Sequence, residues 1–231
     1  MYGPVFLPAS VNAIQHVAVS VQQMGHVQNH AALLFKNTKG KLQVLELRVN
    51  ADSGEASIDA RDHVDGDPLA WAVPRLHPRL LKSFARDCQS IASKPVRLMY
   101  GFRFTELTRL SKTQVGWSIT SAVGATCATL ILALFQNRNH PLVEASSWQP
   151  TADDEKWQAD FHARIEIGLM GRGMTREERA YVDANRSDIP CARFLPQDVV
   201  GSCRCKAHPS SFNETREAGA EISAWIRALP K

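Results

Sequence analysis

The segment Gly124–Phe135 constrains the fold more than any other stretch of the chain. It reads GATCATLILALF, a turn of small residues followed by an apolar run of helical length, with Cys127 at the junction. A thiol in the first turn of a helix faces the positive end of the helix dipole and unpaired backbone N–H groups, which favour the thiolate. The position therefore predicts a nucleophilic Cys127 with a lowered pKa. Cysteine is also among the most buried residue types, so an apolar helix is equally compatible with Cys127 as a core residue.

A candidate base lies far upstream, at the start of a predicted hairpin. His30 precedes the apolar run Ala31–Phe35, and a turn-rich stretch separates this run from Leu42–Val49. Two β-prone runs around such a loop predict a β-hairpin. The return strand would bring Glu46 beside the start of the first strand, where a carboxylate can orient a histidine and stabilise its imidazolium form. His30, Glu46 and Cys127 would then supply a base, an orienting group and a nucleophile.

These motifs resemble the circularly permuted papain-like hydrolases, an NlpC-related group that includes the lecithin retinol acyltransferase-like proteins. The shared features are a histidine at the start of a strand, a polar residue on the next strand and a later GxTCAT-like helix. The resemblance spans roughly residues 30–135, with weaker similarity over 193–200. It implies an α+β fold in which an antiparallel sheet packs against the nucleophile-bearing helix, with a helical C-terminal part. The histidine strand precedes the cysteine helix, which is the permuted order.

The resemblance also implies catalytic roles, with Cys127 as nucleophile, His30 as base and Glu46 as orienting residue. His26 is an alternative base and Gln43 an alternative third residue, while Glu46 has an alternative role as the partner of a surface cation such as Arg48. The implied reaction cleaves an amide bond, of peptide or peptidoglycan type, through an acyl-enzyme thioester and needs no metal or organic cofactor. A thiol acyltransferase or lipid esterase of the same fold, and a non-catalytic binding module, are the alternatives.

The length and composition of the chain predict a single domain over residues 1–231. Its main parts are the histidine hairpin at 29–50, the cysteine helix at 126–136 and a helical extension at 151–231. Further strands are expected at 14–21, 69–73 and 96–102, and helices at 79–92, 152–170, from 175 onward and 213–229. The stretch 52–67 is rich in Asp, Gly and Ser and is interpreted as a loop or short connecting strands.

The composition limits the classes of partner. The formal net charge of +4 is spread along the chain without a block of Lys or Arg, which argues against nucleic-acid binding. No apolar stretch reaches the roughly 18 residues of a membrane helix. Residues 1–8 lack the basic start and apolar centre of a signal peptide, so the protein is expected to be cytoplasmic as made. Export by a dedicated secretion system would leave no mark in the sequence. The expected partner is a peptide or peptidoglycan-like substrate, and a protein partner stays open.

A group of residues near the C-terminus offers the donor types of a tetrahedral zinc site, namely Cys191, Cys203, Cys205 and His208. Their spacing lacks the paired C-x-x-C knuckles of common structural zinc sites, so free thiols are the favoured interpretation. Residues 14–21 are similar to the opening strand of glyoxalase-type metalloenzymes. Those folds repeat a βαβββ unit, whereas the second half of this chain is largely helical.

Three further side chains are candidates for a binding cleft. Trp148 and Trp157 lie near the predicted acidic helix and either line a cleft or belong to the core. Arg103 lies on the approach to the cysteine helix, where it would hold an anionic group or lie at the surface as most arginines do.

Overall fold

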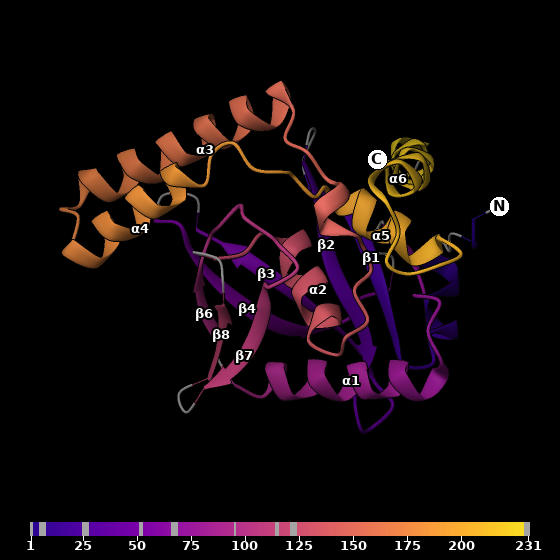
Figure 1. The fold of residues 1–231 in the computed structure, drawn as a ribbon. Helices are drawn as coiled ribbons and strands as arrows, with labels where there is room; N and C mark the ends of the chain where they lie inside the picture. Colours follow the sequence, from indigo (N-terminus) through magenta and orange to yellow (C-terminus); the bar gives the residue numbers. More distant parts are fainter. Residues whose placement is uncertain are drawn as a thin grey trace.

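A six-stranded antiparallel sheet forms the frame of the molecule in the computed structural model of the chain (Figure 1). The structure describes residues 2–4, 8–24, 28–50, 53–65, 69–94, 96–113, 116–120 and 124–228. The strands lie in the spatial order β5-β1-β2-β3-β4-β6. Their bounds are β1 Val17–Met24, β2 Gln28–Lys36, β3 Leu42–Val49, β4 Glu55–Asp62, β5 Leu69–Ala72 and β6 Val96–Met99. A separate two-stranded sheet pairs β7 Arg109–Thr113 with β8 Gly116–Thr120.

The central strand β2 is apolar on both sides because both faces of the sheet are covered there. Ala31, Leu33 and Phe35 join the main core. Ala32 and Leu34 join a smaller core on the opposite face. A strand buried on both faces shows a continuous apolar run rather than an alternating pattern, which explains the sequence of this segment.

Six α-helices complete the described part of the chain. Their bounds are α1 Pro78–Ala92, α2 Cys127–Gln136, α3 Ala152–Gly171, α4 Arg176–Ser187, α5 Pro196–Arg204 and α6 Phe212–Ala228. Helices α1 and α2 pack against the main-core face of the sheet, and α5 contacts β1, β2 and β5. Helices α3 and α4 form a hairpin that packs on Tyr100 and Phe102, just after β6 (Figure 1).

Helix α2 is buried along almost its whole length. Every residue from Ala128 to Gln136 is buried, so the helix is apolar on all sides. It packs against β2 and β3 and contacts β7 and α5. This enclosure fixes the first residue of α2 close to the start of β2.

The α+β class, the hairpin at 29–50 and the cysteine helix are confirmed, and the C-terminal part is helical from α3 through α6. The predicted strands at 14–21, 69–73 and 96–102 correspond to β1, β5 and β6. One eight-residue strand, β4, occupies half of the stretch 52–67, because it pairs with β3 on one side and β6 on the other. Helix α5 and the β7–β8 pair were not expected from the sequence. None of the described helices has the length and apolar character needed to cross a bilayer.

Candidate active site

A capping box fixes the end of α2 that carries Cys127. The hydroxyl of Thr126 accepts a hydrogen bond from the N–H of Thr129 at 3.1 Å, and the Thr129 hydroxyl accepts one from the N–H of Thr126 at 2.8 Å. The backbone N–H groups of Cys127 and Ala128 interact with the Cys127 sulfur. The N–H groups at the start of α2 thus act on the thiol in the direction that lowers its pKa.

Close backbone packing explains the small residues before Cys127. The N–H of Ala125 donates to the carbonyl of Met99 at 3.1 Å, which joins the end of β6 to the turn before α2. A Cβ atom added to Gly124 would overlap the Met99 carbonyl oxygen, and one added to Gly101 would lie 2.5 Å from the Gly124 nitrogen. Only glycine fits at these two positions, so the turn sets where α2 begins.

His30 and Glu46 lie on the neighbouring strands β2 and β3, as the hairpin prediction requires. The strand ladder pairs Ala32 with Glu46, and Nε2 of His30 lies 3.7 Å from Oε2 of Glu46. Their side chains are only 15% and 6% exposed. Because Nε2 faces the carboxylate, Nδ1 is the ring nitrogen left for proton transfer elsewhere.

Two arginines bind the other oxygen of Glu46. Arg48 donates to Oε1 from Nε at 3.0 Å and from Nη2 at 2.8 Å, and Arg61 donates from Nε at 3.3 Å. Burial disfavours the charged carboxylate, but the hydrogen bond from Arg48 and the positive charge of Arg61 hold the pKa of Glu46 below its usual value. The alternative pairing with Arg48 is thus present together with the contact to His30. Arg61 was missed, because only the position of β4 brings it here.

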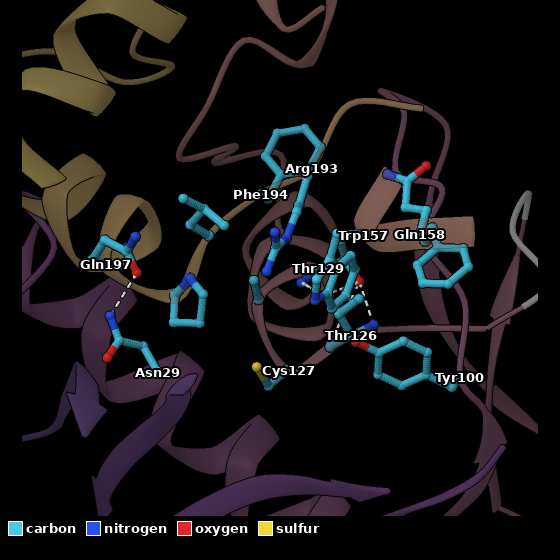
Figure 2. Close-up of a pocket in the computed structure, with 14 residues that line it drawn as sticks. Asn29, Tyr100, Thr126, Cys127, Thr129, Trp157, Gln158, Arg193, Phe194 and Gln197 are labelled. Carbon is cyan, nitrogen blue, oxygen red and sulfur yellow. Dashed lines mark hydrogen bonds between the residues drawn. The ribbon is translucent and has the colours of Figure 1, made fainter. Parts of the chain in front are cut away.

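Two cavities of about 540 Å³ each share Cys127 and Tyr100 in their linings. The first cavity, which we call the histidine cavity, is lined by His30, Glu46 and both of their arginine neighbours. The second, the arginine cavity, is lined by the start of α2, Trp157 on α3 and residues 193–197 before and at the start of α5. Figure 2 shows the arginine cavity, with the Cys127 sulfur between the Asn29–Gln197 hydrogen bond and the ring of Tyr100.

The thiol reaches the sheet at the point where β2 and β3 separate. Their ladder ends at Ala32 and Glu46, whereas β2 stays paired with β1 beyond this point. The N–H of Ala31, just past the end of the ladder, interacts with the Cys127 sulfur. Side chains alternate along a strand, so His30 lies on the face opposite Ala31, where it lines the histidine cavity. Within the described residues, no hydrogen bond joins the Cys127 thiol to the His30 ring.

Burial decides the protonation of the candidate nucleophile and base. It raises the pKa of the Cys127 thiol, although the N–H groups around the sulfur and the positive charge of Arg193 act in the opposite direction. Burial also lowers the pKa of His30, although the Glu46 charge raises it. Both shifts favour a neutral thiol and a neutral imidazole. The predicted low pKa of Cys127 is therefore wrong for the free protein, because the apolar surroundings of α2 outweigh its N-terminal position.

The alternative site residues lie away from this constellation or outside the described ranges. His26 is outside the described residues. Gln43 pairs with Phe35 at the other end of the hairpin, and its side chain donates to Asp62 at 3.3 Å. Arg103 binds Asp188 at 3.2 Å rather than an open anion site. Trp148 belongs to the main core.

The cysteines near the C-terminus do not gather into a metal site. The thiol of Cys203 faces the carbonyl of Val199 at 3.4 Å, and the thiol of Cys191 faces the side chain of Gln158 at 3.8 Å. Across the ranges that the structure describes, no group of three or more His, Cys, Asp or Glu side chains is arranged to hold a metal ion.

The candidate site thus draws its residues from separate parts of the chain. Strand β2 supplies His30, strand β3 supplies Glu46, and the start of α2 supplies Cys127. The segment before α5 supplies Arg193, to which the sequence assigns no role, and α3 supplies Trp157. Comparisons with protein-family models, with curated proteins and with solved structures find no match to this chain.

Proposed function

We propose that the protein is a cysteine hydrolase that cleaves amide bonds of peptide or peptidoglycan type, with a circularly permuted papain-like arrangement. The observation that carries this proposal is the convergence of Cys127, His30 and Glu46 on one cavity, with His30 beside the carboxylate. Catalytic hydrogen bonds are often long in free enzymes and shorten in the substrate complex. The contact between the thiol and Nδ1 of His30 is therefore expected to form when substrate fills the histidine cavity.

The first half of the reaction forms an acyl-enzyme. Because the free pair is neutral, His30 acts as a general base that takes the thiol proton as the sulfur attacks the carbonyl carbon. The oxyanion of the tetrahedral intermediate accepts a hydrogen bond from the N–H of Cys127 at the helix start. The imidazolium then gives its proton to the amine nitrogen, the C–N bond breaks, and a thioester remains on Cys127.

The second half returns the thiol. His30 takes a proton from water as the water oxygen attacks the thioester, and the C–S bond breaks when the intermediate collapses. The imidazolium returns the proton to the Cys127 sulfur, and the acid product leaves. In both halves Glu46 stabilises the imidazolium, since its Oε2 faces the ring while the arginines hold Oε1.

The first prediction tests acyl-enzyme formation with an activated ester. Incubation with p-nitrophenyl acetate should release p-nitrophenolate in a burst and add one acetyl group to Cys127, found by peptide mass spectrometry at pH 7. His30→Ala should lower the rate of acetylation by about 10²-fold or more, the usual contribution of a positioned base. Its melting temperature should stay near that of the wild type, because His30 lies at the edge of the cavity rather than in the core.

Cys191 provides the matched control within the same molecule, because it is also a partly exposed free thiol and has no histidine assigned to it. Acetylation of Cys127 no faster than that of Cys191, or unaffected by His30→Ala, would contradict the hydrolase and favour a binding module. The bond type is then read by digesting purified peptidoglycan and a mixed peptide pool, with Cys127→Ala as the blank. New amine and carboxylate ends are expected only with the wild type.

A further inference from the structure

Arg193 presents an unused positive charge to the arginine cavity. Its guanidinium carbon lies 3.7 Å from the centre of the Trp157 ring, and both side chains line the cavity together with Cys127 (Figure 2). Stacking on an indole occupies one face of the planar guanidinium. The N–H groups at its edge are left to donate within the cavity.

No carboxylate in the described ranges forms an ion pair or hydrogen bond with Arg193. The charges of Asp154 and Asp198 reach it, but both side chains are engaged elsewhere. Asp154 accepts from the N–H of Thr151 at 3.0 Å, and Asp198 pairs with Nε of Arg216 at 3.4 Å. By contrast, Arg103 has its own carboxylate partner. Within these ranges no carboxylate bonds directly to this half-buried guanidinium, so its N–H donors are available to an anion from outside.

We propose that Arg193 binds a carboxylate of the substrate and so selects acyl substrates that carry an anionic group close to the scissile bond. A guanidinium edge matches the two oxygens of a carboxylate in a paired arrangement. Arg193 and Cys127 line the same cavity, so a carboxylate held by the guanidinium shares that cavity with the carbonyl under attack. That the bound anion belongs to a substrate rests on the proposed hydrolase activity, whereas the anion site itself does not depend on that activity.

A pair of thiol reagents that differ in one group tests the site without any turnover. Iodoacetate carries a carboxylate where iodoacetamide carries a neutral amide, and both alkylate the same sulfur. The ratio of their rates at Cys127, measured by peptide mass spectrometry at pH 8 and low salt, should fall about tenfold in Arg193→Gln, a change that corresponds to about 1.4 kcal/mol. Any change in the pKa of the thiol affects both reagents equally and cancels in the ratio. Added salt should reduce the wild-type preference.

Arg103→Gln is the matched control, because this arginine is already paired with Asp188, and its ratio should equal that of the wild type. An unchanged ratio in Arg193→Gln overturns the anion site. If the rate ratio falls in Arg193→Gln but p-nitrophenyl acetate does not acetylate the wild type, the anion site stands and the hydrolase is rejected. If the wild type is acetylated but the rate ratio does not change in Arg193→Gln, the hydrolase stands and the anion site is rejected.

A measurement of equilibrium binding replaces the rate ratio if the partly exposed Cys127 thiol is alkylated too slowly to time. Succinate and its neutral counterpart succinamide are titrated while tryptophan fluorescence is recorded, with Trp157→Phe used to assign the signal to the residue beneath Arg193. Succinate should bind about tenfold more tightly than succinamide to the wild type and equally to Arg193→Gln. Equal binding of the two compounds to the wild type overturns the proposal.

Discussion

At the scale of single residues, Glu46 divides its two oxygens between separate partners. Oε1 accepts from Arg48 and Arg61, whereas Oε2 faces His30 at 3.7 Å. The arginines keep the pKa of Glu46 low, so the carboxylate stays charged when His30 gains a proton. A lone carboxylate at this depth would lose part of its charge to burial.

The effect of Glu46 on His30 leads to a prediction about acid pH. The Glu46 charge raises the pKa of His30, against the lowering by burial, so Glu46→Gln should lower that pKa further. In the proposed mechanism a protonated His30 cannot act as a base, so the acid limb of the acetylation rate with p-nitrophenyl acetate should move to lower pH. The plateau rate should also fall, because the imidazolium formed in the transition state loses its counter-charge. Rates measured from pH 4.5 to 8 show both changes.

Asp59 gives a control on the next strand. It pairs with Nε of Arg48 at 3.7 Å and is not among the groups that shift the pKa of His30. Asp59→Asn should leave the acid limb in place. An acid limb that moves to higher pH in Glu46→Gln, or does not move at all, would remove Glu46 from the catalytic group.

At the scale of elements, the segments that are buried on all sides were the ones that the sequence predicted. Residues 31–35 of β2 and most of α2 are enclosed by the core, so each appears in the sequence as an uninterrupted apolar run. The sequence of β4 is EASIDARD, and this segment is a strand because it pairs with β3 and β6. A local sequence pattern does not show such long-range pairing. α5 did carry a signal, since Pro196 begins it and Asp198 accepts from the N–H of Leu195 at 3.3 Å.

A close crossing of α5 and α6 gives an element-scale prediction of stability. A Cβ atom at Gly201 would lie 2.7 Å from the Gly219 nitrogen and 3.0 Å from the Thr215 carbonyl oxygen. These are backbone atoms of α6, which cannot turn aside as a side chain does. Gly201→Ala should therefore destabilise the protein by about 1–3 kcal/mol through overpacking, despite the better helix propensity of alanine. Urea unfolding followed by circular dichroism measures the change.

Gly171, the last residue of α3, is the matched control for this substitution. A Cβ atom there meets nothing within 4 Å. Gly171→Ala should be neutral or stabilise the protein by up to about 1 kcal/mol, because alanine restricts the unfolded chain. Equal free energies of unfolding for Gly201→Ala and Gly171→Ala would mean that α5 and α6 move apart with little loss of stability.

At the scale of the whole molecule, Arg204 ties the N-terminal segment to the C-terminal helices. Its Nε donates to the carbonyl of Gly3 at 2.7 Å, one Nη donates to the carbonyl of Ala218 at 3.2 Å and the other to Glu221 at 2.6 Å. The N–H of Gly3 donates in turn to the carbonyl of Arg204 at 2.8 Å. One buried side chain thus connects regions about two hundred residues apart in sequence.

The two ends of this network should differ in their contribution to stability. Arg204→Leu leaves the buried carbonyl of Gly3 without its side-chain donor and removes the second donor to the helical carbonyl of Ala218, so it should cost about 1–3 kcal/mol of unfolding free energy. Glu221 is 50% exposed, so Glu221→Gln should cost less than about 1 kcal/mol. Arg138→Gln breaks a pair with Asp87 whose arginine is far more exposed than Arg204, and it gives the cost of losing a surface pair for comparison. Chemical unfolding in which Glu221→Gln costs as much as Arg204→Leu would contradict this order.

The sequence predicted the local placement of three candidate side chains but not the residues around them. The start of a helix and the strands of a hairpin place Cys127, His30 and Glu46 by local rules, and their catalytic roles stay predictions. Arg61 and Arg193 were not predicted, because their positions depend on β4 joining the sheet and on the segment before α5 crossing the start of α2. The pKa of Cys127 was predicted in the wrong direction, because a sequence shows the helix end but not how deeply it is enclosed.

Cys127 lines both cavities, and this arrangement would determine which acceptor takes the acyl group from an acyl-enzyme. With the acyl portion anchored by Arg193 on one side, the departing amine would leave through the histidine cavity, and the incoming acceptor would enter by the same route. Water arriving there completes hydrolysis, while an amine or alcohol of suitable shape completes transfer. The choice between hydrolysis and acyl transfer would then depend on which acceptor molecules fit the histidine cavity, rather than on a different set of catalytic groups.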